Sequence, residues 1–246
     1  MVAAQKNHSL ILALDSSSRS LTFAVGGQGR KIEHIETDKD FRHAETVVLQ
    51  IDHLMKAAGV RLDEVDCFAC GIGPGSFTGL RVGLAAVKAL MMSRRAICFT
   101  MSTLDLIAQN ALGFQLGESS HAHVLVDARQ SRYYTAHYVW RDRQLIKQGT
   151  DRILNIQEII PNIKEESVIL GDGIPSFTST DISKHLKGIK FLPNTAWYPH
   201  AAEIVRLIVE NSPLLTETDI RGLKPAYLRP TEPEERLLEL EKRKNG

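Results

Sequence analysis

The chain has 246 residues, 43% of them hydrophobic and 24% charged, a composition typical of globular proteins rather than disordered ones. Thirty Lys and Arg against 29 Asp and Glu leave a net charge of +1, without the basic excess that direct binding of nucleic acid usually requires. The first residues contain no apolar core of signal-peptide length, and no later stretch is long and apolar enough for a membrane span. We therefore expect a cytoplasmic protein with no membrane contact.

The N-terminal part of the sequence predicts a β-hairpin followed by a helix. Residues 10–14 form an apolar run of strand length that ends at Asp15 and a turn of three serines. Residues 21–25 resume with β character and end in glycines, so the chain is expected to return as a second strand. Residues 43–58 then place their apolar side chains on one face, as an amphipathic helix does.

A second apolar strand leads into a glycine-rich loop, GIGPGSFTGLRVG, at residues 71–83. The loop is not a Walker A motif, because no lysine follows before Lys88, and it is not a dinucleotide fingerprint, because Ser76 stands where the third glycine is required. Gly73 and Gly75 still permit close backbone approach, and a helix N-terminus can receive an anion. Backbone geometry is the predicted role, and a degenerate phosphate site stays open.

Neither the cysteines nor the histidines predict a metal or redox site. Cys67 and Cys70 form a C-x-x-C inside the strand before the loop, and side chains three apart on a strand face opposite sides. Two buried structural thiols are therefore expected. His121 and His123 share one strand face but have no nearby carboxylate or cysteine, so we expect a structural role for them as well.

The pattern of the first half recurs about 110 residues later. Residues 124–126 end at Asp127, and a short polar loop and a β-rich return at 133–140 follow. The phrase CGIGPGSF at 70–77 is echoed by LGDGIPSF at 170–177. This repeat predicts two related α/β lobes, although Asp and Gly also end unrelated strands by coincidence.

The predicted domain organisation follows from this repeat. We place a first lobe at residues 1–105, a second lobe at 106–230 and a highly charged tail at 231–246. Further helices are expected at 102–112 and at 200–210, the latter at the end of the second lobe.

The helix that follows the glycine loop has two apolar stripes. The bulky stripe steps by three and four residues, and the other stripe contains Gly79, Gly83, Ala86 and Leu90. Either the helix at 43–58 covers the excess, or the small stripe lies on its own sheet and the bulky one meets a partner, which we prefer. The expected interface residues are Val47, Ile51, Leu54, Phe77, Leu80, Leu84, Val87 and Met91.

Six segments in the same order resemble the TsaB (YeaZ) family, and the glycine loop is the most specific of them. The matching segments are ILALDSSS at 11–18, RHAETVV at 42–48, GIGPGSFTGLRVG at 71–83, MSTLDLIA at 101–108, VDARQSRYY at 126–134 and YLRP at 227–230.

The resemblance implies the duplicated actin-like, sugar-kinase-like, Hsp70-like α/β fold. It also implies a non-catalytic partner of a TsaD-like paralogue, which makes N6-threonylcarbamoyladenosine at position 37 of tRNA. A small TsaE-like ATPase would be the third partner, tRNA would be contacted only through the complex, and the chain alone would form a homodimer. No cofactor and no metal are implied, because the paralogue's two metal-binding histidines four apart have no counterpart here.

The resemblance also identifies the candidate phosphate loops. In nucleotide-binding members of the superfamily a glycine follows the hairpin aspartate, whereas here Ser16 follows Asp15 and Ala128 follows Asp127. The degenerate loops would therefore contain Asp15, Gly73, Gly75, Ser76 and Asp127. The alternative function is an active ATP-dependent kinase or ATPase of the same superfamily.

Overall fold

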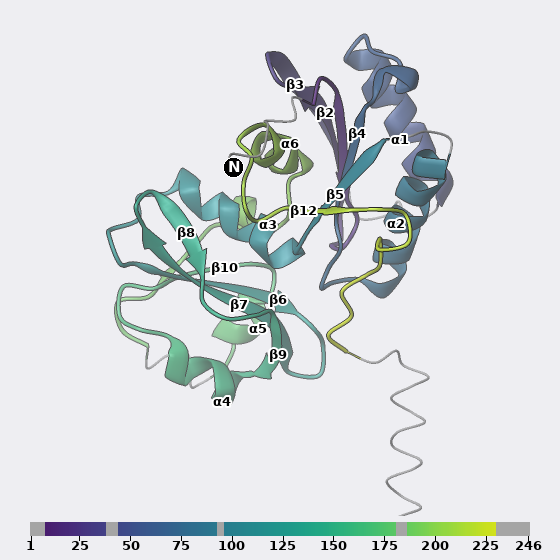
Figure 1. Cartoon of the computed structure of the whole chain (residues 1–246). Helices are drawn as coiled ribbons and strands as arrows, with labels where there is room; N and C mark the ends of the chain where they lie inside the picture. The colour runs from purple at the N-terminus through teal and green to yellow at the C-terminus, as the bar shows by residue number, and fades with distance from the viewer. Residues whose placement is uncertain (1–7, 38–43, 93–95, 181–185, 230–246) are drawn as a thin grey trace, which may run out of the picture.

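The structure, a computed structural model, describes residues 8–37, 44–92, 96–180 and 186–229. These residues form two sheets, one above the other in Figure 1, with helices on both faces of each. The predicted tail at 231–246 lies outside the described residues, as does His43 at the start of the first predicted helix.

The first sheet has the strand order β12-β5-β4-β1-β2-β3. The hairpin strands β1, β2 and β3 pair antiparallel, and β4 and β5 run parallel to β1. Its strands are β1 (Ile11–Asp15), β2 (Leu21–Gly27), β3 (Arg30–Thr37), β4 (Cys67–Gly71), β5 (Ile97–Met101) and β12 (Thr216–Thr218).

The second sheet repeats this plan in the order β11-β10-β6-β7-β8, with β9 paired to β7. Again three hairpin strands pair antiparallel, and two later strands run parallel to the first of them. Its strands are β6 (His121–Asp127), β7 (Arg132–Arg141), β8 (Gln144–Lys147), β9 (Arg152–Asn155), β10 (Val168–Leu170) and β11 (Lys190–Phe191). The predicted internal repeat is confirmed.

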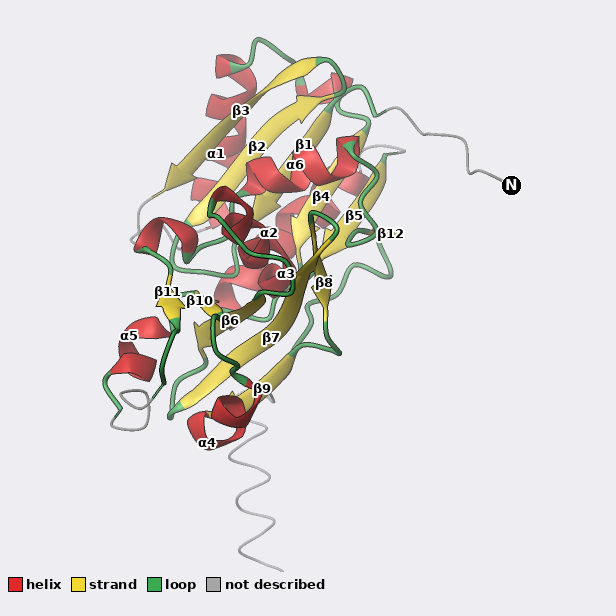
Figure 2. Cartoon of the chain, turned by 90° about the vertical axis from the view of Figure 1, so that its left-hand side faces the viewer, coloured by secondary structure: helices red, strands yellow, loops and turns green. Residues whose placement is uncertain are grey.

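Helices cover both faces of the first sheet. Alternate β1 residues face the core under α1 (Ala44–Ala57) and α2 (Phe77–Met92), and the others face α6 (Ala201–Val209) on the opposite side (Figure 2). The helix predicted near 200–210 therefore exists, but it packs on the first sheet instead of the second. Strand β12 also joins the first sheet, so part of the range assigned to the second lobe lies against the first.

The second sheet is covered by α3 (Thr103–Gln109) on one face and by the short helices α4 (Ile156–Ile159) and α5 (Ile174–Thr178) on the other. Ser102 is the N-cap of helix α3, and its hydroxyl accepts hydrogen bonds from the backbone N–H groups of Leu104 and Asp105. This confirms the helix predicted from residue 102, and a 3-10 turn continues it over Asn110–Gly113.

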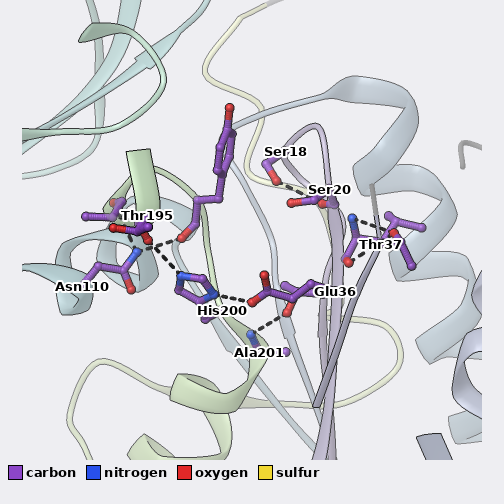
Figure 3. Close-up of polar contacts among 12 residues, drawn as sticks. Ser18, Ser20, Glu36, Thr37, Asn110, Thr195, His200 and Ala201 are labelled. Atoms are coloured by element: carbon purple, nitrogen blue, oxygen red, sulfur yellow. Dashed lines mark hydrogen bonds and ion pairs between the residues drawn. The ribbon is translucent and has the colours of Figure 1, made fainter. Parts of the chain in front are cut away.

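The chain returns to the first sheet through residues 192–201, and side chains fix this crossing (Figure 3). Asn110 Nδ2 donates to the carbonyl oxygens of Ala196 and Tyr198, at 3.2 and 2.8 Å. His200 Nδ1 lies 2.5 Å from Glu36 Oε1 on β3, and this hydrogen bond raises the pKa of His200 and lowers that of Glu36. The crossing segment is therefore held at one end by Asn110, just after α3, and at the other end by a charge-assisted contact that fixes the start of α6 on β3.

Candidate functional site

The aspartate at the end of β1 is enclosed by the chain itself. Asp15 has no exposed surface, and burial raises the pKa of its carboxyl group. Its Oδ1 accepts hydrogen bonds from Ser17 N at 2.8 Å and Ser17 Oγ at 2.6 Å, and its Oδ2 accepts one from Thr103 Oγ1 at 3.1 Å. Both carboxyl oxygens are therefore satisfied by this chain without a ligand.

The glycine loop packs directly onto the serines that follow Asp15. The N–H of Ser76, at the loop's end, donates to the carbonyl oxygen of Ser17 at 2.6 Å. A Cβ added at Gly71, Gly75, Gly79 or Gly83 would lie 1.8, 2.3, 2.0 or 2.1 Å, respectively, from Asp15 Oδ2, Ser17 O, Ser16 O and Ser16 Oγ. Glycine is required at these four positions because the hairpin occupies the space of a side chain.

Gly73 has a different requirement. Its φ is +98°, a left-handed conformation that favours glycine, and a Cβ there would lie 2.8 Å from Leu80 Cδ1. Its N–H donates to Thr103 Oγ1 at 3.2 Å, and its carbonyl accepts the Thr103 N–H at 2.8 Å. Thr103 therefore ties the loop to Asp15 and to the start of α3.

The start of α2 is also occupied by the chain's own groups. Ser76 Oγ accepts the N–H of Gly79 at 3.2 Å, and the Ser76 carbonyl accepts the N–H of Leu80 at 2.9 Å. The backbone N–H groups of Ser76, Gly79 and Leu80, which could otherwise donate to an anion at this helix end, are therefore already hydrogen-bonded within the chain. The structure thus brings Gly73, Gly75 and Ser76 close to Asp15, but the serines that follow Asp15 fill the space where a phosphate would bind.

Asp127 lies in a more open setting. Its side chain is exposed, and its Oδ1 accepts the N–H of Arg129 at 2.7 Å. Its own N–H donates to Asp172 Oδ1 at 3.1 Å, and burial raises the pKa of Asp172. The second repeat thus reproduces the strand-end aspartate but not the enclosed carboxyl group.

Most residues expected at the partner interface are buried inside the single chain. Seven of them are at most 8% exposed, and all of these but Leu80 pack in the cluster between α1, α2 and the first sheet: Val47, Ile51, Leu54, Leu80, Leu84, Val87 and Met91. Phe77 is only partly buried. The interpretation in which α1 covers the bulky stripe of α2 is therefore the one that fits for Leu84, Val87 and Met91, which share a buried cluster with α1 and the first sheet. The space beside Gly79 and Gly83 is occupied by Ser16.

A different apolar surface is exposed on the same two helices. Val48 and Leu49 on α1 are 65% and 57% exposed, and Met92 at the end of α2 is 79% exposed. Ala85 and Ala89, one helical turn apart on α2, are also exposed. We call these five residues the α1–α2 surface. Sequence reasoning missed Ala85 and Ala89 because alanine fits either face of a helix, and the apolar spacing over residues 43–58 did not separate the exposed Val48 and Leu49 from their buried neighbours.

The cysteines and histidines have structural environments. Cys67 and Cys70 face opposite sides of the first sheet, as expected, and burial raises the pKa of the Cys67 thiol. His137, which the sequence did not single out, stacks on His123 at 4.4 Å between ring centroids, and its Nε2 lies 2.8 Å from His121 Nδ1. Within the described residues no group of three or more His, Cys, Asp or Glu side chains has a geometry that could hold a metal ion.

Helix length adds one observation on membranes. Across the described ranges, no helix is both long and apolar enough to cross a bilayer.

Comparison with known proteins identifies the family. Residues 38–220 match the family model "TsaD: tRNA N6-adenosine threonylcarbamoyltransferase". The chain belongs to this family. Within it the chain is similar to proteins named "tRNA threonylcarbamoyladenosine biosynthesis protein TsaB", so the resemblance to TsaB (YeaZ) is confirmed.

The relatives differ in how much of each chain aligns. The protein of Haemophilus influenzae is 31% identical over 61% of this chain and 61% of its own length. The Escherichia coli protein is 25% identical over 89% of this chain and 94% of its own length. The Bacillus subtilis protein is 25% identical over 94% of this chain and 99% of its own length.

A solved structure shares the fold. YeaZ from Pseudomonas aeruginosa has a TM-score of 0.74 at 22% identity, and the match covers 89% of this chain and all of that one. The predicted α/β fold of the TsaB family, with two related sheets, is therefore confirmed.

Proposed function

We propose that this chain is a non-catalytic partner subunit in the synthesis of N6-threonylcarbamoyladenosine at tRNA position 37. The observation that carries the proposal is the enclosure of Asp15, whose two carboxyl oxygens are bonded to Ser17 and Thr103. A nucleotide-binding relative would need this carboxylate beside a phosphate and its metal. Here a ligand would first have to displace the serine hairpin from the glycine loop.

The partner that best fits the α1–α2 surface is a TsaD-like paralogue. Exposed apolar side chains on neighbouring helices lose unfavourable contact with water when a second helix pair covers them. The small Ala85 and Ala89 would let a partner helix approach closely, and Val48, Leu49 and Met92 would supply the apolar area around them. In the free chain, the same surface would support a homodimer.

The other assignments follow from this role. Because the net charge is only +1, we assign tRNA contact to the assembled complex instead of this chain alone. A small TsaE-like ATPase is the third proposed partner, the site of action is the cytoplasm, and no cofactor is assigned to this subunit.

The interface is tested by placing a charge on the α1–α2 surface. Ala89→Glu should leave the fold unchanged, because the side chain points into solvent, but should weaken binding to the purified paralogue by about 100-fold, since a charge would be desolvated in the contact. Ile146→Glu is the matched control, because Ile146 is 43% exposed but lies on β8 of the other sheet. Binding is measured by calorimetry, with circular dichroism to check folding.

Two results would contradict the proposal. If folded Ala89→Glu binds the paralogue as tightly as the unmodified chain, the interface lies elsewhere. If the purified chain turns over ATP and loses this activity in Asp15→Ala, it is instead an ATPase or kinase of the superfamily.

A further inference from the structure

Residues 223–229, here called the strap, connect the core of the first lobe to the hairpin loop of the second. Leu223 has no exposed surface and packs in the core under α1 and α2. The N–H of Ala226 donates to the carbonyl oxygen of Ile72 beside the glycine loop, at 2.8 Å. At the other end Arg229 donates from Nη1 to the carbonyl oxygen of Ala128 at 2.9 Å. One short segment is thus anchored on both lobes.

An aromatic contact holds the middle of the strap. The ring of Tyr227 lies over that of Phe77, in the first turn of α2, with 5.0 Å between the centroids and an angle of 30°. The Arg81 guanidinium lies 4.0 Å from the Phe77 centroid, and its Nε donates to Tyr227 Oη at 3.3 Å. Tyr227 remains 41% exposed, so these contacts, and not burial in a core, fix its position.

The loop that Arg229 binds has an unusual backbone. Arg129, Gln130 and Ser131 have φ values of 62°, 53° and 59°, three consecutive left-handed residues that are not glycine. L-residues disfavour this conformation, so surrounding contacts must maintain it. Besides the bond to Ala128, Arg229 donates from Nη2 to Gln130 Oε1 at 2.6 Å. Its planar fork satisfies two acceptors of the loop at once, a geometry that lysine cannot reproduce.

We propose that the strap is a tether that couples the two lobes. Arg229 holds the strained loop at 128–132, and Tyr227 fixes the strap on α2, so that loosening one end loosens the other. The chain itself then sets the distance between the Asp15 hairpin and the Asp127 hairpin, a distance that a bound ligand would otherwise control. This inference does not rest on the proposed function.

Amide hydrogen exchange of the full chain tests the coupling from both ends. Arg229→Gln removes the contact with the second lobe, and Tyr227→Ala removes a contact with the first. Thermodynamic coupling is reciprocal, so Tyr227→Ala should raise exchange at Ala128 and Arg132 about tenfold, although the contacts described for Tyr227 are with Phe77 and Arg81 of the first lobe. Arg229→Gln should likewise raise exchange at Ala226. Arg221→Gln, which alters an exposed arginine just before the strap, should change none of these amides.

The reciprocal effects decide the result. If Tyr227→Ala leaves exchange at Ala128 and Arg132 unchanged, or if Arg229→Gln leaves Ala226 unchanged, the two ends act separately and the tether is refuted. If Arg229→Gln does not fold, Arg229→Lys takes its place, since it keeps the charge but loses the fork. A folded lysine variant with exchange equal to that of the unmodified chain would refute the role of the guanidinium.

Discussion

Gly79→Ala tests whether the glycine loop is closed on the serine hairpin. In a solvated helix this substitution stabilises by about 1 kcal/mol. Here the added Cβ would lie 2.0 Å from the carbonyl oxygen of Ser16, so backbone would have to move. Overpacking costs about 1–3 kcal/mol. We expect the upper end of this range, because the clash is with a backbone oxygen and cannot be relieved by rotating a side chain. The net result should be a loss of about 2 kcal/mol in the free energy of unfolding.

Urea unfolding followed by circular dichroism measures this loss, and the melting temperature should fall by about 4–8 °C. Gly113→Ala is the matched control, because a Cβ at Gly113 meets nothing within 4 Å, and its stability should be unchanged or slightly higher. A Gly79→Ala variant as stable as the unmodified chain would mean that the hairpin does not fill the loop. The structural role assigned to these glycines would then be wrong.

Two further predictions concern buried polar groups. Thr103→Val should lower the free energy of unfolding by about 1–3 kcal/mol, because Asp15 Oδ2 and the Gly73 N–H lose a hydrogen-bond partner. Thr78→Val, at an exposed threonine, is the control in the same urea assay. Equal losses of stability in the two variants would refute the reasoning. His123 has its pKa lowered to about 3 by burial, so it stays neutral in the folded chain, and stability should fall as the pH drops below about 6.5. Because of this histidine, the free energy of unfolding should fall by about 2 kcal/mol between pH 7 and pH 5. His123→Phe should remove that part of the pH dependence.

The regular elements could be predicted because their signals are local. Apolar runs that end at Asp15 and Asp127 predicted the two hairpins, and the recurrence of this pattern predicted the two related sheets. The later return of the chain could not be read in this way. Strand β12 has three residues and no periodic pattern, and its place beside β5 depends on pairing with residues more than 100 positions away.

The helix stripes show a second limit of sequence reasoning. Spacing identified both apolar stripes of α2, but spacing alone does not say what each stripe meets. Ser16 decides the matter, because its carbonyl oxygen fills the space beside Gly79 and its side-chain hydroxyl fills the space beside Gly83. His137 was missed for a related reason, since its contact with His123 depends on the register between β6 and β7.

The central claim, that this subunit supports tRNA modification without doing chemistry, is tested most directly by Asp15→Asn in a reconstituted reaction. Asparagine has the same shape and can still bond to Ser17 and Thr103, but it removes the carboxylate that phosphate and metal chemistry would need. With the TsaD-like paralogue and the small ATPase present, we expect formation of N6-threonylcarbamoyladenosine in tRNA to depend on this chain and to be equal for the unmodified and Asp15→Asn forms. Loss of modification by a folded, paralogue-binding Asp15→Asn chain would contradict the claim.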